Sequence, residues 1–123
     1  DYNNDMNTEY LYDVLDQEKV DIANNNNKLL EEEIDGLADF YKVMGDPTRI
    51  RLLSALAVGE LCVSDLCNVV GMNRSAVSHQ LRILKAAKLV SNNKAGKTVY
   101  YSLADEHVAS VFNLTLEHIR EKD

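Results

Sequence analysis

The sequence predicts a mainly α-helical domain of the α+β class, in which several short helices come before one β-hairpin and a last helix. Two observations predict this fold. Apolar residues recur at helical spacing in segments separated by glycine and Asp-Pro signals, and one stretch of β-branched and aromatic residues follows a glycine-containing turn. The 123 residues suffice for one domain with a modest core, which we place at residues 28–123. Residues 1–27 are expected to form an acidic, partly disordered extension with at most one short helix.

Two helical patterns are expected in the first third of the chain. Residues 1–8 are polar and are predicted to be disordered. A short amphipathic helix is predicted from the spacing of Tyr10, Leu11, Val14 and Leu15. The asparagines at 24–27 are expected to end this helix and to form a flexible linker. A longer pattern from Lys28 to Met44 predicts a second helix, because its apolar residues lie at helical spacing.

The centre of the chain carries helix start and stop signals. Asp46 before Pro47 is typical of an N-cap followed by the first helical position, and this helix is expected to reach about Ala57. Ser64 is predicted to cap a shorter helix, which Gly71 ends. The segment therefore contributes two short helices to the domain.

The helix after Gly71 has the character of a DNA recognition helix. It begins at Asn73 or Arg74, and together with the preceding helix it forms a helix-turn-helix. Its polar side chains form one stripe without a carboxylate: Ser75, Ser78, His79 and Arg82. A solvated helix face would usually include a glutamate, whereas small polar side chains with an arginine are typical of a helix in the major groove.

A β-hairpin is expected directly after this helix. The β-rich runs 89–91 and 99–103 are joined by the basic, glycine-containing segment 92–97. A hairpin in this place is a wing, so the order of elements predicts a winged helix-turn-helix with an N-terminal helix and a C-terminal dimerisation helix. Nine residues are predicted to contact DNA: Arg74, Ser75, Ser78, His79, Gln80, Arg82, Lys85, Lys94 and Lys97.

The distribution of charge supports DNA binding, although the net charge of the chain is −7. Residues 1–39 hold twelve of the acidic residues and only two basic ones, so residues 40–123 carry a net charge of +3. No aspartate or glutamate lies between Asp65 and Asp105, while this window contains six lysines and arginines. A local positive surface is what phosphate binding requires. It also disfavours a pure protein-interaction module.

The last helix is expected to carry four metal ligands in two pairs: Asp105 with His107, and His118 with Glu121. Asp105 is also a candidate N-cap of this helix, and the sequence does not separate its capping role from its role as a ligand. On a helix, the two histidines lie on nearly one face but roughly 16 Å apart at 1.5 Å per residue. One ion cannot span that distance, since zinc–nitrogen bonds are about 2 Å long. Two copies of the helix that run antiparallel across a two-fold axis can close the sites. The pattern therefore predicts a metal and a homodimer together.

These motifs give the chain a resemblance to the ArsR/SmtB family of metal-responsive repressors, most closely to its zinc-sensing branch. The resemblance covers residues 37–121 and rests on segments 45–51, 60–66, 75–81 and 96–101 together with the ligand pairs. It implies a dimeric repressor that binds an inverted-repeat operator without metal and releases it with metal, which would derepress genes for metal export or sequestration. Asp105 and His107 of one subunit would meet His118 and Glu121 of the other. Two imidazoles and two carboxylates suit Zn²⁺, with Co²⁺ as a surrogate.

The resemblance also implies a second metal site, which looks incomplete here. Cys62 and Asp65 match its core, but Ser64 stands where the thiol-rich branch has a second cysteine, and residues 1–61 contain no cysteine or histidine. An alternative function is a repressor that senses oxidants or persulfides through Cys62 and Cys67. Their five-residue spacing disfavours it, because on a helix they would point about 140° apart.

Other classes of protein fit less well. No apolar run is long enough for a membrane span, and two cysteines suit a reducing cytoplasm, where we expect the protein to act. A zinc hydrolase would need an open coordination position, which four protein ligands do not leave. We therefore expect no enzyme and no small organic substrate.

Overall fold

The computed structural model describes residues 10–26 and 28–121. Residues 1–8, which were predicted to be disordered, lie outside the described residues. The chain divides into two compact units with a boundary between Gly36 and Leu37. The domain limits expected from the sequence, 1–27 and 28–123, stay a prediction.

The first unit contains α1 (Gln17–Asn26), so the short helix predicted before the asparagine run is present, but its expected beginning near Tyr10 is wrong. The helix begins later because Asp16 caps it: Asp16 Oδ1 accepts a hydrogen bond from the backbone N–H of Lys19 at 3.1 Å. A side-chain bond from Gln17 to Asp21 at 2.9 Å supports the first turn. The helix also continues through three of the four asparagines that were expected to end it.

Helix α2 (Glu31–Met44) starts three residues later than predicted, and α3 (Pro47–Val58) starts where the sequence placed it. Glu33 determines the start of α2, because its carboxylate accepts from the backbone N–H of Leu30 at 2.9 Å. Asp46 caps α3 as predicted, with Oδ2 accepting from the N–H of Arg49 at 3.1 Å. At the first helical position Pro47 costs no hydrogen bond, because a backbone N–H there would have no intrahelical partner.

The helix-turn-helix consists of α4 (Val63–Val70) and α5 (Arg74–Ala86). The predicted cap of α4 at Ser64 is wrong: Cys62 occupies the N-cap position without a side-chain cap bond. Gly71 ends α4 in the left-handed conformation, with φ of 70°, and its N–H donates to the carbonyl of Cys67 at 2.8 Å. Asn73 then caps α5, because its Oδ1 accepts from the N–H of Ala76 at 2.8 Å.

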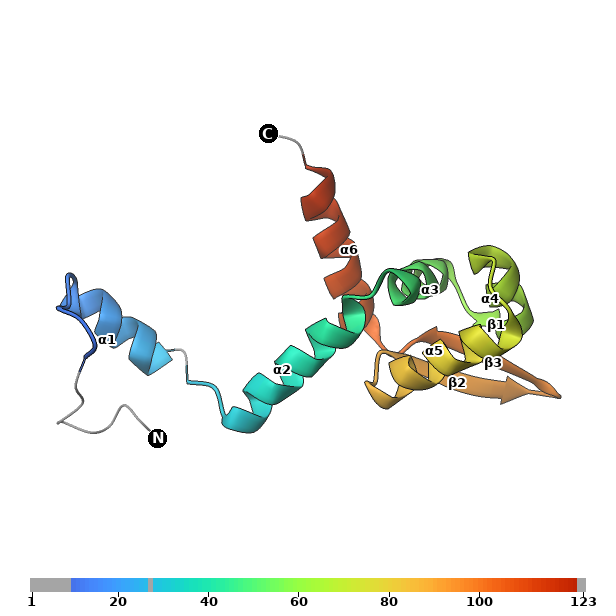
Figure 1. Ribbon diagram of the computed structural model, residues 1–123, viewed down its shortest axis with the longest axis horizontal. Helices are drawn as coiled ribbons and strands as arrows, with labels where there is room; N and C mark the ends of the chain where they lie inside the picture. The colour runs from blue at the N-terminus through green and yellow to red at the C-terminus, as the bar shows by residue number, and fades with distance from the viewer. Residues whose placement is uncertain (1–9, 27, 122–123) are drawn as a thin grey trace. The chain divides into compact units, whose positions relative to one another are not determined.

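The wing belongs to a three-stranded antiparallel sheet of order β1-β3-β2 (Figure 1). Its strands are β1 (Leu61–Cys62), β2 (Val90–Ala95) and β3 (Thr98–Leu103). The hairpin strands are longer than predicted, because β2 continues through the asparagines to Ala95 and pairs with Thr98. Only Gly96, with φ of 64°, and Lys97 remain in the turn. Strand β1 was not predicted; it pairs with β3 through Leu61 and Tyr101.

The last element of the chain is α6 (Glu106–Arg120), with Asp105 as its N-cap. The core of the second unit is apolar and is formed mainly by Leu52, Leu53, Leu56, Leu66, Val77, Leu81, Leu84, Leu89, Val90 and Val108. One face of α5 packs in this core, and the opposite face of that helix is exposed to solvent. Among the helices in residues 10–26 and 28–121, none is long and apolar enough to cross a membrane.

Candidate metal centre and nucleic-acid interface

The two oxygens of Asp105 have different roles at the start of α6. Oδ1 accepts from the backbone N–H of Val108 at 3.0 Å, which caps the helix. Oδ2 lies 3.6 Å from Nδ1 of His107, a side chain that is 94% exposed. The bond from Val108 and the neighbouring imidazole lower the pKa of Asp105. Asp105 can therefore cap the helix and still offer a charged oxygen beside His107.

The second pair lies at the opposite end of α6. Nδ1 of His118 is 4.0 Å from Oε1 of Glu121, and the His118 side chain is 85% exposed. Glu121 is the C-cap residue, so it has left the helix and its carboxylate is free to turn toward the imidazole. In the described part of the chain, no three metal-binding side chains converge. One chain thus brings together only two candidate ligands at each end of α6.

An apolar strip, formed by Val111 and Leu114, joins the two pairs along α6. His107, Val111, Leu114 and His118 follow one another at intervals of four, three and four residues, which places them on one helix face. Leu114 is 64% exposed although it lies in the middle of this face. An exposed leucine between two pairs of metal ligands is typical of a surface that packs against another helix.

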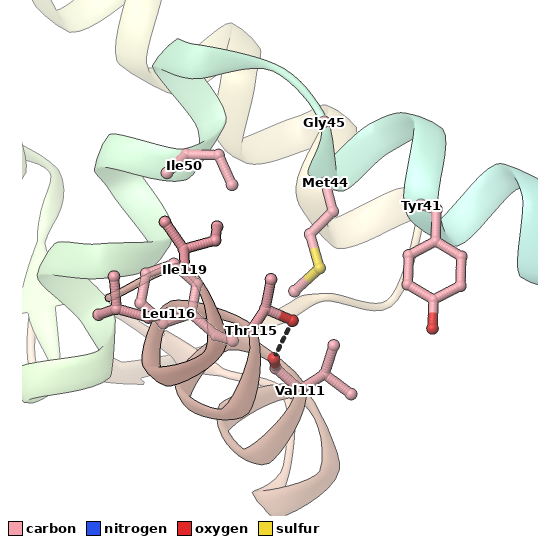
Figure 2. A pocket seen from close by; sticks show the side chains of 9 residues that line it. Tyr41, Met44, Gly45, Ile50, Val111, Thr115, Leu116 and Ile119 are labelled. Atoms are coloured by element: carbon pink, nitrogen blue, oxygen red, sulfur yellow. Dashed lines mark hydrogen bonds between the residues drawn. The ribbon is translucent and has the colours of Figure 1, made fainter. Parts of the chain in front are cut away.

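Beside this strip, α6 forms an apolar cavity of about 290 Å³ with the end of α2 and the start of α3 (Figure 2). Helix α6 lines it with Val111, Phe112, Thr115, Leu116 and Ile119, and the other wall consists of Tyr41, Met44, Gly45 and Ile50. The only polar side-chain group of α6 in the cavity is turned inward on its own helix, since the Thr115 hydroxyl donates to the carbonyl of Val111 at 2.7 Å. The wall contains no charge.

The predicted DNA-contacting residues lie on α5 and the wing, and most of them are exposed. Ser75, His79 and Arg82 are open to solvent, whereas Ser78 is half-buried. Lys85 donates to the side chain of Asn92 at 2.9 Å, which connects α5 with strand β2. Helix and wing therefore present one continuous surface.

A second cavity of about 300 Å³ brings Arg74 and Lys97 together between α4 and the wing. Arg74 donates to the hydroxyl of Ser64, which the sequence had given a capping role instead. Strand β3 completes the wall with Thr98 and Val99. Two cationic side chains on one concave surface suit a backbone phosphate.

Gln80 differs from the other predicted DNA contacts. It is half-buried like Ser78, but its Oε1 accepts from Nε of Arg49, a residue of α3, at 3.0 Å. Sequence reasoning missed Arg49, Ser64 and Asn92, since none of them lies on the polar stripe of α5. An arginine on the otherwise apolar side of a helix was the one signal that pointed to Arg49.

The second metal site that the resemblance implies has few candidate ligands in the structure. Cys62 lines the cavity beside Arg74, and Asp65 is exposed in the first turn of α4. Cys67 packs against the core instead, as predicted, and both thiols are free. Among the described residues nothing adds a third ligand to Cys62 and Asp65.

Comparison with known proteins identifies the family. Residues 46–92 match the model of bacterial regulatory proteins of the arsR family. The chain is 48% identical over 87 residues to the transcriptional repressor SmtB homolog of Synechocystis sp., which covers 71% of this chain and 66% of the relative. It is 36% identical over 110 residues to a cadmium resistance transcriptional regulatory protein, a CadC homolog, of Staphylococcus aureus, which covers 89% of this chain and 85% of the relative.

The chain belongs to the ArsR family of bacterial regulatory proteins. ArsR-family proteins are DNA-binding regulators of transcription and not enzymes, so the predicted family and the predicted absence of catalysis are both confirmed. The fold is confirmed by a solved structure from Mycobacterium bovis, described as the homodimeric winged helix-turn-helix DNA-binding domain of "a possible ArsR-family transcriptional regulator". It superposes with a TM-score of 0.67 at 32% identity, over 70% of this chain and 80% of the other.

Proposed function

We propose that this ArsR-family protein is a zinc-sensing repressor. Its metal-free homodimer would bind an inverted-repeat operator, and zinc at the C-terminal helices would release it. The observation that carries the proposal is the arrangement on α6, where two exposed carboxylate–histidine pairs flank an exposed leucine. Two relatives, one named a transcriptional repressor and one a cadmium resistance regulatory protein, support the coarser function of a metal-responsive repressor.

The two sites would assemble from two antiparallel copies of α6. Asp105 and His107 of one copy would face His118 and Glu121 of the other, with Leu114 of both copies near the two-fold axis. Each copy contributes to two equivalent sites, as a two-fold interface requires. The apolar strip would supply the packing, and the exposed pairs would lie at both ends of the helix contact.

The ligand set fits zinc. Two imidazole nitrogens and two carboxylate oxygens complete a tetrahedral shell, and no thiolate is available in these pairs to favour softer ions. Bound zinc would supply a rigid link between the two helices. The capping bond of Asp105 would orient its second oxygen, as bonds around a metal ligand usually do.

DNA binding would use the surface of α5 and the wing. The two copies of α5 in the dimer would enter successive major grooves, with Ser75, His79 and Arg82 toward the bases. Arg74, Lys85, Lys94 and Lys97 would contact phosphates, which position the protein but do not read sequence. A regulator of this kind would act in the cytoplasm.

Zinc would release the operator because it favours a dimer arrangement in which the recognition helices no longer match the spacing of the half-sites. The coupling is reciprocal, so bound operator must weaken zinc binding by the same factor. A ligand shifts such an equilibrium only by its different affinities for the two arrangements.

Fluorescence anisotropy with an operator duplex tests the proposal through His118→Ala, with Glu117→Ala as the control. Glu117 is an exposed neighbour on the same helix and belongs to neither pair. Zinc should release wild type and Glu117→Ala, whereas His118→Ala should stay bound. Release of all three proteins at the same zinc concentration would exclude the α6 pairs as the sensing site.

A second candidate is a thiol-based sensor, which one observation favours: the free thiol of Cys62 lines the basic cavity between α4 and the wing. An oxidised or persulfidated Cys62 would add bulk and charge beside Arg74 and Lys97. This function predicts that Cys62→Ser abolishes regulation by oxidants or persulfide while His107→Ala does not. If instead His107→Ala abolishes regulation, Cys62→Ser does not, and only zinc regulates the wild type, the thiol-based sensor is excluded and the zinc sensor remains.

A further inference from the structure

Arg49 lies where α2, α3 and α5 meet, and its guanidinium donates to two of these elements. Nε donates to Oε1 of Gln80 on α5 at 3.0 Å, and Nη1 donates to the backbone carbonyl of Val43 in α2 at 3.3 Å. We propose that Arg49 is a positioning residue of the DNA-binding surface, which fixes the recognition helix to the junction of α2 and α3. The inference rests on the proposed DNA binding and adds a residue that does not touch DNA.

The geometry requires an arginine at this position. A planar guanidinium presents several N–H donors in fixed directions, so it can bridge a side-chain amide and a carbonyl that belong to different helices. A lysine keeps the charge but offers a single nitrogen on a flexible stem. Arg49 and Gln80 are both half-buried, so water competes for this bond less than it would at the surface.

The bond also changes what Gln80 can do. A glutamine that reads adenine uses both ends of its amide, accepting from the base amino group and donating to the ring nitrogen. Here Oε1 already accepts from Arg49, which turns the amide oxygen toward the protein. Gln80 is therefore assigned to holding α5 in place, while its exposed neighbour His79 stays on the DNA side.

Loss of this bond would affect specific and non-specific DNA binding differently. Contacts to bases depend on the exact position of α5, whereas binding to any phosphate backbone depends mainly on charge. Arg49→Met removes both a charge and the bond. Arg51→Met removes only a charge, because Arg51 is exposed on the same helix. The two variants are matched in chemistry and separate the two effects.

The experiment uses a duplex of about 30 base pairs, three helical turns, that wild type selects from a random pool, and a scrambled duplex of the same composition. Fluorescence anisotropy gives both affinities. Arg49→Met and Arg51→Met should lower the affinity for the scrambled duplex equally. Arg49→Met should lower the affinity for the selected duplex about tenfold more than Arg51→Met does. Arg49→Lys should restore the scrambled-duplex affinity but not the selected-duplex affinity.

A double variant tests whether Arg49 acts through Gln80. Arg49→Met with Gln80→Met should bind the selected duplex no more weakly than Arg49→Met alone, since both changes remove the same bond. Additive losses, or equal selected-to-scrambled ratios for Arg49→Met and Arg51→Met, overturn the inference. Circular dichroism checks folding; if Arg49→Met does not fold, Arg49→Lys and Gln80→Met make the same comparison. A wild type that selects no duplex would overturn DNA binding itself.

Discussion

Asp105 shows how one side chain can serve both the fold and the candidate metal site. The sequence placed it at the start of the last helix, but capping and metal binding both favour an aspartate, so the residue type could not separate the two roles. The structure separates them by oxygen: Oδ1 accepts from Val108, and Oδ2 faces His107. The capping bond holds this candidate ligand in a fixed position relative to the helix axis.

The lowered pKa of Asp105 predicts how pH affects the metal-free protein. Because the folded state binds the proton less tightly than the unfolded state, Asp105 contributes stability above the ordinary value of 3.8, and this is lost as pH falls through the lower folded pKa. Asp105→Asn keeps a capping oxygen but cannot ionise. The melting temperature of wild type should exceed that of Asp105→Asn at pH 6, and the difference should shrink below pH 4. A difference that stays constant from pH 6 to pH 3 would contradict the assigned cause.

At the scale of elements, the sequence predicted best where caps are local. The starts of α3, α5 and α6 follow from Asp46, Asn73 and Asp105, each of which accepts from a backbone N–H three residues on. The predicted start of the first helix near Tyr10 was wrong because an apolar pattern alone does not form a helix. Leu11 and Leu15 are almost fully exposed, so no packing would stabilise a helix there.

Contacts between distant segments were the part that the sequence could not predict. Strand β1 has two residues, too few for an alternating pattern. It exists because it pairs with β3, which follows the helix-turn-helix in the sequence whereas β1 precedes it. Arg49 and Gln80 are 31 positions apart, so no local spacing connects them. The closeness of the two residues in each candidate pair was predictable because they are at most three positions apart at one helix end, whereas metal binding by these pairs stays a prediction.

Gly71 controls the turn between α4 and α5. Its φ of 70° is left-handed, and a β-carbon there would meet no atom within 4 Å, so only the backbone conformation opposes a side chain. Gly71→Ala should lower the free energy of unfolding by about 1–2 kcal/mol. Urea unfolding measures this, with Gly36→Ala as a control, since Gly36 has no positive φ and open space around it. The control should be neutral or slightly stabilised, as an alanine favours the helix interior of α2.

The wing lysines predict a salt effect without a change in sequence preference. Lys97 lies in the turn of the hairpin and lines the same cavity as Arg74. If it contacts a phosphate, Lys97→Gln should reduce the slope of log affinity against log salt by about 1, equally for selected and scrambled duplexes. Lys42→Gln, which alters an exposed lysine at the end of α2, should leave the slope unchanged. An unchanged slope for Lys97→Gln would remove the wing tip from the interface.

For the whole molecule, the proposed function requires a basic DNA-binding surface and a dimer interface in one chain of net charge −7. The basic side chains proposed to contact DNA lie on α5 and the wing, and the uncharged apolar surface lies on α6 and beside it. A monomer would leave Leu114 and Ile119 in water and would hold only half of the ligands of each proposed metal site. Dimerisation would cover the apolar surface and complete the ligand shell in the same step.

Leu114→Asp tests this link between assembly and metal binding. Burying an unpaired carboxylate at the centre of the α6 contact should raise the dimer dissociation constant at least about a hundredfold, since each tenfold corresponds to 1.4 kcal/mol. Leu15→Asp is the matched control, because Leu15 is 100% exposed and lies outside α6. Sedimentation equilibrium of the metal-free proteins should show dimers for the control and monomers for Leu114→Asp. The monomeric variant should also bind zinc weakly although all four ligands are intact, because each pair would lack the other. A Leu114→Asp protein that stays dimeric and binds zinc as wild type does would place the interface elsewhere.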